Sequence, residues 1–310
     1  MLKHRIIVGP LLVAAVLVLA LLDDLLAGIA LPASLAGLSE SGKIPPGVVA
    51  FPVIATLSVL ASLELAGILR RKSVRVSRMM FCFAAVLGLI VSCFVPTWTR
   101  TITSVAIVST AAAVVMTASM LYAARNRSSE GVPAAVGGAL VAFVYLGLMF
   151  GFLLAIRREY PIWVLVWVLL MPKACDIGAY FIGRAFGRHR LIPWLSPGKT
   201  WEGLMGGVAV AAVIGVAGAW ILGNLWERSA TPAATAEFLL GGLIAGAGLG
   251  LIGQAGDLMA SVFKRDAGVK DSGDTVPGFG GVLDVIDSPL LVAPAAYWAL
   301  ELGRYLSLPG

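Results

Sequence analysis

The sequence predicts an all-α, polytopic integral membrane protein with about nine transmembrane helices. Hydrophobic residues make up 59% of the 310 residues and charged residues only 13%, whereas roughly a quarter of a soluble protein is charged. Apolar runs of about 20 residues, the length that crosses the hydrocarbon core of a bilayer, recur along the whole chain. We therefore expect the chain to fold with lipid around most of its surface.

The apolar runs give the candidate spans in chain order. They cover residues 6–30, 46–69, 79–96, 103–123, 132–155, 162–183, 203–224, 238–260 and 282–302. Asp23 and Asp24 interrupt the first run, so the first helix is expected to stop there or to break into two pieces. Basic residues precede this run as in a secretory signal, but no small-residue cleavage site follows, and we expect the helix to be retained.

Basic residues predict which links between the spans face the cytoplasm. Lys3 and Arg5 precede the first span, and the links after two, four, six and eight crossings are also basic. By the positive-inside rule, the N-terminus and these links lie on the cytoplasmic side, which we expect to be that of a bacterial inner membrane. Arg157 and Arg158 fall on the opposite side and are the exception.

Several function classes are disfavoured by what the sequence lacks. The net charge is +6, but no basic segment interleaved with aromatic residues suggests nucleic-acid binding. Cys82, Cys93 and Cys175 lie in apolar runs without metal-ligand spacing and are expected to pack. His4 and His189 are the only histidines, and we expect neither to have a base or metal partner nearby, which argues against zinc sites and His-based catalysis.

The two halves of the chain differ in character. Residues 1–160 form plain Ala/Val/Leu spans, which we expect to anchor and pack the protein, with dimer contacts left open. In residues 161–310, polar residues and glycines enter the apolar segments. We therefore predict that residues 161–310 form the catalytic domain.

The densest group of charged residues lies near the C-terminus. It holds six of the 17 acidic residues of the chain together with three basic residues: Asp257, Lys264, Arg265, Asp266, Lys270, Asp271, Asp274, Asp284 and Asp287. On a helix, Asp257, Ser261 and Lys264 would share one face, and so would Asp284 and Asp287. Charged groups in or near a bilayer are costly and therefore usually functional.

Carboxylates beside lysines suit a magnesium–triphosphate complex, because Mg²⁺ takes one or two carboxylates together with substrate phosphates and water. Gly278, Gly280 and Gly281 would let backbone N–H groups approach an anion at the start of the last span. In the alternative interpretation, this is a solvated loop whose charges neutralise one another, and Asp284 caps a helix. The position of Asp284 and Asp287 inside an apolar span disfavours that alternative.

A second polar group precedes the seventh span, in the segment SPGKTWEG of residues 196–203. Its Gly-Lys-Thr resembles the end of a Walker A motif, but Pro193 stands where that motif needs its first glycine, and no preceding strand is expected. A P-loop is therefore disfavoured. Lys199 and the hydroxyls of Ser196 and Thr200 could contact a phosphate before the helix, and helix capping is an alternative of equal weight.

A third group, Lys173 and Asp176, lies within the sixth span. The two side chains could simply pair with each other, or Asp176 could face the same cavity as the other groups. Glu64, the lone acid of the second span, carries less weight, because packing or an interface explains it as well as function does.

Two long segments of the C-terminal half resemble the phosphatidate cytidylyltransferases, or CDP-diacylglycerol synthases. Residues 261–287, SVFKRDAGVKDSGDTVPGFGGVLDVID, are similar to the family signature S-x-x-K-R-x4-K-D-x-G, then a Pro or Gly, then H-G-G and D-R-x-D. Residues 176–203, DIGAYFIGRAFGRHRLIPWLSPGKTWEG, resemble a second block of the family. Phe279 and Val285 replace the histidine and the arginine of the signature, so no proton transfer is expected at these two positions.

The resemblance implies transfer of CMP from CTP to phosphatidic acid with release of pyrophosphate, with Mg²⁺ as cofactor and a second cation left open. The catalytic residues that it implies are Asp257, Lys264, Asp271 and Asp284. The metal ligands that it implies are Asp257, Asp284 and Asp287. The residues that it implies for substrate binding are Asp176, Ser196, Lys199, Thr200, Ser261, Arg265 and Lys270.

Two other activities stay open at this point. A CTP-dependent transferase acting on another lipid phosphate or on a polyprenol would need the same charged groups. A cation-coupled transporter would use intramembrane Asp and Lys residues as an ion path, but the sequence shows none of the inverted symmetry common in transporters. The expected partners are CTP, phosphatidic acid and the bilayer, with no nucleic acid and with a homodimer left open.

Overall fold

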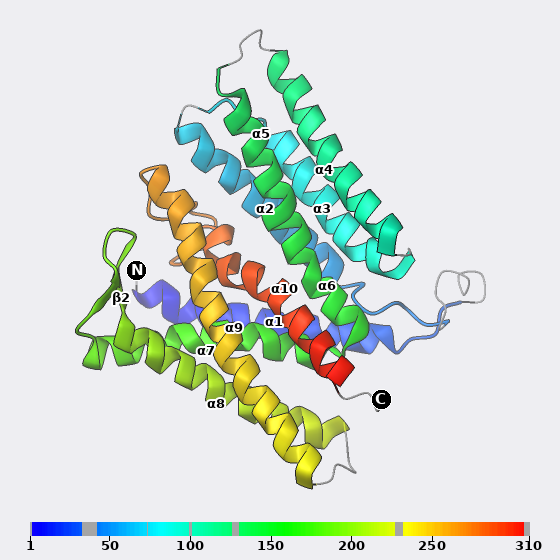
Figure 1. Ribbon diagram of the computed structural model, residues 1–310, viewed down its shortest axis with the longest axis vertical. Helices are drawn as coiled ribbons and strands as arrows, with labels where there is room; N and C mark the ends of the chain where they lie inside the picture. Colours follow the sequence, from blue (N-terminus) through cyan, green and yellow to red (C-terminus); the bar gives the residue numbers. More distant parts are fainter. Residues whose placement is uncertain are drawn as a thin grey trace. The chain divides into compact units, whose positions relative to one another are not determined.

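A computed structural model describes residues 2–32, 42–72, 74–98, 101–125, 130–226 and 232–306. Helices dominate this part of the chain (Figure 1). They are α1 (Leu2–Ala27), α2 (Ala50–Arg71), α3 (Arg78–Trp98), α4 (Thr101–Ala124), α5 (Val132–Val141), the π-helix η2 (Ala142–Leu148), α6 (Met149–Glu159), α7 (Ile162–Phe186), α8 (Trp201–Trp226), α9 (Pro232–Asp266) and α10 (Val282–Leu306). The side chains of Lys3 and Arg5, which support the predicted orientation, lie outside the described part.

These helices confirm the prediction of a polytopic membrane protein. Eight segments within the described residues are long and apolar enough to cross a membrane: Ile7–Ala27, Ala50–Arg71, Thr103–Ala124, Val132–Glu159, Ile162–Phe186, Trp201–Gly223, Ala236–Asp266 and Val282–Tyr305. The third predicted span corresponds to α3, which contributes the shorter apolar stretch Arg78–Cys93. Every apolar run of the sequence therefore forms a helix close to its expected place.

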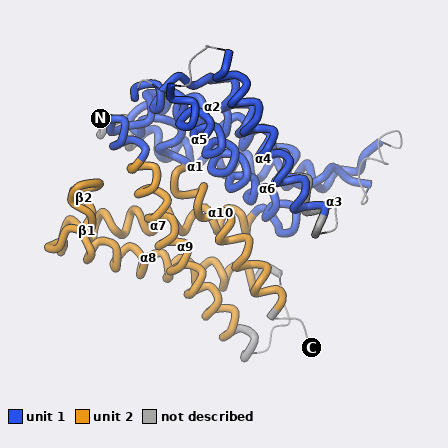
Figure 2. The backbone as a smooth tube through the Cα atoms, turned by 45° about the horizontal axis from the view of Figure 1, so that its top comes forward, with its two compact units in different colours: residues 1–162, 263–286 blue, residues 163–262, 287–310 orange. Residues whose placement is uncertain are grey.

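The chain divides into two compact units, shown in different colours in Figure 2. Unit 1 comprises Met1–Ile162 and Phe263–Ile286, and unit 2 comprises Trp163–Val262 and Asp287–Gly310. The end of α9, the loop after it and the first residues of α10 thus belong to unit 1. The functional division into an anchoring and a catalytic part stays a prediction.

In unit 1, α3 packs closely against the π-helix η2. A Cβ atom built on Gly88 of α3 would lie only 3.0 Å from the Cα atom of Gly147 in η2. On the neighbouring side, the hydroxyl of Ser58 in α2 donates to the Leu146 carbonyl at 2.8 Å, inside the core. A π-helical turn frees carbonyls from the regular ladder, and this buried serine satisfies one of them.

A buried ion pair joins α1 to α6 in unit 1. Arg157 Nε lies 2.5 Å from Asp23 Oδ2, and both side chains are almost fully buried. The Asp23 carboxylate also accepts backbone N–H groups at the start of α2, from Val49 at 2.9 Å and Ala50 at 3.2 Å. The carboxylate is therefore satisfied within the fold, and α1 continues through it to Ala27, so the expected stop or break at Asp23 is wrong.

The same contacts explain the basic residues on the unexpected side. The positive-inside rule concerns arginines that face the aqueous loops. Arg157 is instead buried against Asp23, and Arg158 donates to the backbone carbonyl of Cys93. Both side chains bind groups inside the protein. Arg157 and Arg158 are therefore compatible with the predicted orientation.

In unit 2, small residues let α7, α8 and α9 approach closely. A Cβ atom on Gly178 of α7 would lie 3.1 Å from the Cα atom of Gly207 in α8. A Cβ atom on Gly215 of α8 would similarly lie 2.8 Å from the Cα atom of Gly246 in α9. Helices in lipid associate through such small-residue contacts because apolar side chains gain little by leaving the lipid.

A short antiparallel hairpin links α7 to α8 and departs from the all-α expectation. Strand β1 (Arg190–Ile192) pairs with β2 (Ser196–Thr200), and Leu195 N–H donates to the Ile192 carbonyl at 3.2 Å across the turn. Strands of three and five residues are too short for an alternating apolar pattern to be recognised. The hairpin is not a P-loop, because Gly198, Lys199 and Thr200 lie within strand β2 and not in a glycine-rich turn that follows a strand.

Candidate functional site

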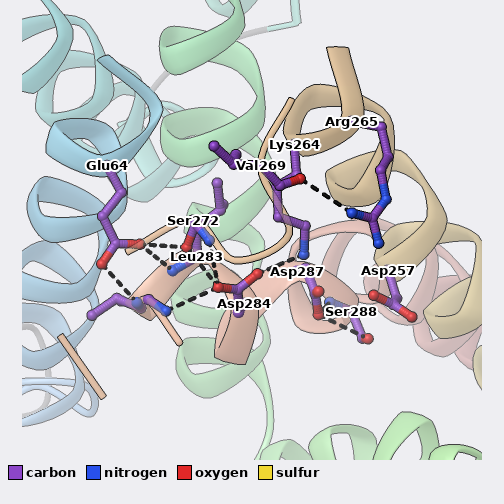
Figure 3. A network of polar contacts seen from close by, with 12 residues as sticks. Glu64, Asp257, Lys264, Arg265, Val269, Ser272, Leu283, Asp284, Asp287 and Ser288 are labelled. Atoms are coloured by element: carbon purple, nitrogen blue, oxygen red, sulfur yellow. Dashed lines mark hydrogen bonds and ion pairs between the residues drawn. The ribbon is translucent and has the colours of Figure 1, made fainter. Parts of the chain in front are cut away.

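The first polar network lies in unit 1 and surrounds the N-terminus of α10. It consists of Glu64, Lys264, Ser272, Thr275 and Asp284, and we call it the α10-cap network. Figure 3 shows all of these except Thr275 as labelled side chains. The loop that leads into α10 is folded tightly enough for Val276 and Gly280 to form an isolated β-bridge. Gly280 has a φ of +102°, a conformation that side chains other than glycine rarely adopt.

Glu64 of α2 holds the beginning of α10. Its carboxylate accepts the backbone N–H groups of Val282 and Leu283 at 2.8 and 2.9 Å. It also accepts the hydroxyls of Ser272 and Thr275, each at 2.8 Å. A helix N-terminus has unpaired N–H groups and a partial positive charge, so a carboxylate is a favourable partner there.

Asp284 of α10 accepts hydrogen bonds through both of its oxygens. Its Oδ2 accepts the Ser272 N–H at 2.7 Å, the Ser272 hydroxyl at 2.9 Å and the Gly281 N–H at 2.9 Å. Its Oδ1 lies 2.5 Å from Lys264 Nζ, and these two side chains are only 8% and 9% exposed. Because the Ser272 hydroxyl has a single proton, Glu64 and Asp284 share one donor.

The α10-cap network corrects one expectation and supports another in part. We expected the glycine-rich turn to present its N–H groups to a phosphate. In the structure, the N–H groups of residues 281–283 bind the carboxylates of Glu64 and Asp284 instead. Asp284 does cap its helix, as the alternative interpretation held, but it also faces a buried ammonium rather than solvent.

Gly281→Ala tests the packing of this network. A Cβ atom on Gly281 would overlap Ser272 Oγ and Glu64 Oε2. Overpacking of this kind costs on the order of 2 kcal/mol, so we expect the midpoint of thermal unfolding in detergent to fall by several degrees. The matched control is Gly248→Ala on α9, where an added Cβ meets nothing within 4 Å. Equal melting temperatures of the two variants would contradict the described packing.

The second network lies in unit 2 and is named here the Lys199 network, comprising Asp176, Lys199, Gln254 and Asp257. Lys199 Nζ lies 2.7 Å from Asp257 Oδ2 and donates to Gln254 Oε1 at 2.8 Å. The buried Gln254 amide donates in turn to Asp176 Oδ1 at 2.5 Å. Lys173 Nζ lies 3.7 Å from Asp176 Oδ2. The predicted simple pair therefore exists, but its distance is longer than those of the other contacts in this group.

Two residues beside this network differ from expectation. Thr200 Oγ1 accepts the Gly203 N–H at 3.1 Å and caps α8, so it takes the helix-capping role that was left as an alternative. His189 was expected to lack a base partner, which is wrong, because its Nδ1 lies 2.6 Å from Glu202 Oε1. Glu202 also accepts the backbone N–H groups of Arg188 and His189, which holds the histidine at the base of the hairpin.

Other predicted site residues make separate contacts. Asp287 is buried, and its Oδ1 accepts the Ser288 N–H at 2.6 Å (Figure 3). Arg265 is exposed and donates to the Val269 carbonyl at 3.3 Å. Among the described residues, neither network includes Ser196, Ser261, Lys270 or Asp271. Lys270 and Asp271 are exposed on the loop after α9.

Sequence reasoning missed Ser272, Thr275 and Gln254 and gave Glu64 little weight. Glu64 and Gln254 carried a usable signal, because polar side chains inside apolar spans need partners. Ser272 and Thr275 lie in the resembling segment at positions that the family signature leaves unspecified. Their role depends on Glu64, which is more than 200 positions away in the chain.

The described residues contain no group of three or more His, Cys, Asp or Glu side chains that could hold a metal ion by themselves. The carboxylates of Asp284 and Asp257 each face a lysine ammonium, at 2.5 and 2.7 Å. Each of these carboxylates is thus paired with a cationic group of its own unit. Carboxylate oxygens are also the ligands that Mg²⁺ takes, one or two at a time, when substrate phosphates and water complete its shell. The predicted ligand set of Asp257, Asp284 and Asp287 stays a prediction.

Comparison with known proteins shows which protein family the chain resembles. Residues 42–302 match the model of the Cytidylyltransferase family. The chain is 36% identical over 170 residues to a phosphatidate cytidylyltransferase of Bacillus subtilis. The aligned segment covers 54% of this chain and 59% of the relative. The chain is 43% identical over 148 residues to a phosphatidate cytidylyltransferase of Synechocystis, covering 47% and 46%.

A third relative has no described activity. The chain is 41% identical over 142 residues to the "Uncharacterized protein YnbB" of Escherichia coli, covering 46% of this chain and 44% of that protein. The matched segments thus span about half the length of these curated relatives. The family match itself extends over most of the chain and includes both polar networks, and on this basis the protein belongs to the cytidylyltransferase family.

Proposed function

We propose that this protein is a phosphatidate cytidylyltransferase, which makes CDP-diacylglycerol and pyrophosphate from CTP and phosphatidic acid. The observation that carries the proposal is the Lys264–Asp284 pair, a buried ammonium and carboxylate inside the segment that resembles the family signature. The names of the Bacillus and Synechocystis relatives support the same substrate. Membership of an enzyme family leaves the transporter alternative without support.

The reaction suits a site that has lysines and carboxylates but no side-chain nucleophile. A phosphate oxygen of phosphatidic acid attacks the α-phosphorus of CTP, the bond to the β-phosphate oxygen breaks, and pyrophosphate leaves. The attacking oxygen is already an anion, so catalysis consists mainly of positioning and neutralising charge. Phe279 in place of the family histidine is compatible with this chemistry.

Each network has groups suited to one part of this task. Lys264 is proposed to neutralise developing charge on a phosphate, and Asp284 holds its ammonium in place. Lys199, oriented by Asp257 and Gln254, is proposed to bind a phosphate of CTP. Mg²⁺, held by Asp257, Asp284 and Asp287 together with substrate phosphates, would neutralise the triphosphate charge. We place the reaction at the cytoplasmic face of a bacterial inner membrane, and a homodimer stays a prediction.

A second candidate is a CTP-dependent enzyme acting on another lipid phosphate or on a polyprenol. It is favoured by Phe279, whose ring lies beside Gly9 of α1. A Cβ atom on Gly9 would be 3.6 Å from Phe279 Cζ, so the altered position contacts a membrane-spanning helix. An apolar ring there could change which lipid is accepted without changing the phosphate chemistry.

The deciding experiment is an assay of the purified protein with labelled CTP, Mg²⁺ and one lipid at a time. With phosphatidic acid, we expect CDP-diacylglycerol and pyrophosphate in equal amounts, and no product after chelation with EDTA. Release of CDP together with a phosphorylated polyprenol would establish the second candidate. Turnover that requires a different lipid phosphate would retain the cytidylyl transfer and refute the substrate.

A further inference from the structure

The hairpin between α7 and α8 has two chemically different faces. Lys199 and Leu195 point inward, Lys199 to its network and Leu195 into a buried position. Trp194 at the turn is 76% exposed, and Pro193 beside it is also exposed. The inner face is thus fixed by polar contacts, while the tip presents a large aromatic ring to its surroundings.

Both ends of the hairpin are tied to membrane spans. α7 and α8 have 25 and 26 residues, which corresponds to about 37 and 39 Å of helix. The hydrocarbon core is about 30 Å thick, and the bilayer with its headgroups about 40–45 Å. The helix ends therefore reach the headgroup region, where Phe186 and Trp201 are 70% and 53% exposed.

The base of the hairpin carries exposed basic residues. These are Arg184, Arg188 and Arg190. Glu202, at the start of α8, accepts the backbone N–H groups of Arg188 and His189 and pairs with the His189 ring. Arginines next to exposed aromatic rings match the interface of a bilayer, where tryptophan favours headgroup depth and basic groups attract anionic lipids. A water-soluble anion would account for the arginines but not for the tryptophan.

From this arrangement we infer that the β1–β2 hairpin lies in the headgroup region of the bilayer. Trp194 enters the interface, and Arg188 binds the phosphates of anionic phospholipids. The hairpin then holds Lys199 at the membrane surface, because Lys199 lies on the same strand pair as the anchoring turn. The inference concerns the bilayer surface and does not rest on the proposed reaction.

The test uses the full-length protein in nanodiscs and compares its fluorescence with that of Trp194→Phe. The difference spectrum isolates Trp194 among the eight tryptophans. We expect it to be quenched by phosphatidylcholine brominated near the headgroup and protected from aqueous iodide. Trp298→Phe is the matched control, since Trp298 is similarly exposed, at 65%, on the α10 span and shows that lipid contact is detectable. Quenching by iodide without quenching by brominated lipid would overturn the inference.

A second measurement tests the anionic-lipid contact. Adding phosphatidylserine to the nanodisc is expected to increase lipid quenching of Trp194 in the unmodified protein and to have at most half this effect in Arg188→Gln. Arg304→Gln, an exposed arginine on α10, should respond like the unmodified protein. An unchanged response of Arg188→Gln, or an equal response to CTP in place of phosphatidylserine, would refute the assignment of Arg188 to lipid.

Discussion

Replacing Asp284 with asparagine is expected to lower CTP-dependent turnover by on the order of 100- to 1000-fold, the usual effect of removing one electrostatic group from an active site. Asparagine has nearly the same size, but it brings no charge to face Lys264. The ammonium, only 9% exposed, would then lack its counterion and lose its fixed position. The measurement is the initial rate of CDP-lipid formation, with circular dichroism in detergent to confirm that the helices remain.

Asp274→Asn is the matched control for this variant. Asp274 lies on the same loop before α10, but its side chain is exposed. We expect its rate to stay within twofold of the unmodified protein. Normal turnover of Asp284→Asn would refute the catalytic assignment, and an equal loss in both variants would show that the loop responds only to its total charge.

Glu64→Gln is expected to produce the second large effect, a loss of both stability and turnover. Glutamine has one acceptor oxygen where Glu64 now accepts four hydrogen bonds, two of them from the first N–H groups of α10. Hydrogen bonds to charged groups contribute about 1.5–3 kcal/mol each. The start of α10 would be held less firmly, and Asp284 with it. We expect a clearly lower melting temperature and a kcat that falls more than the KM for CTP rises.

The comparison variant is Glu237→Gln, an exposed glutamate on α9. It should leave both the melting temperature and kcat unchanged. A Glu64→Gln protein that melts early but turns over normally would reduce Glu64 to a structural cap. One that melts normally and turns over slowly would assign it a direct part in catalysis.

The sequence predicted the helices well because a bilayer imposes a strong local rule. A span needs about 20 apolar residues wherever it occurs, so each of the runs could be recognised without knowledge of its neighbours. Helix ends within the membrane are less constrained. The α1 helix passes Asp23 because Arg157, from a distant part of the chain, neutralises that carboxylate. No local pattern contains that information.

The polar site was predictable in its chemistry but not in its contacts. The lysines and aspartates of the resembling segments were identified as a group, and the structure pairs Lys264 with Asp284 and Lys199 with Asp257. The pairing of Glu64 with Ser272 joins residues 208 positions apart, which spacing cannot reveal. The hairpin that carries Lys199 was missed because its strands are short, and with it the contact between His189 and Glu202.

The capping of α10 by Glu64 also bears on how the protein is made. During synthesis α2 emerges long before the serine, the threonine and the helix start that satisfy its carboxylate. A charged group left alone in the hydrocarbon is costly, so the Glu64 side chain must stay near the hydrated interface until the last span arrives. The hydrogen bonds of Glu64 can therefore form only after the C-terminal segment has been inserted. A chain that stops before residue 272 therefore carries an acid in its second span without any of these four hydrogen-bond donors.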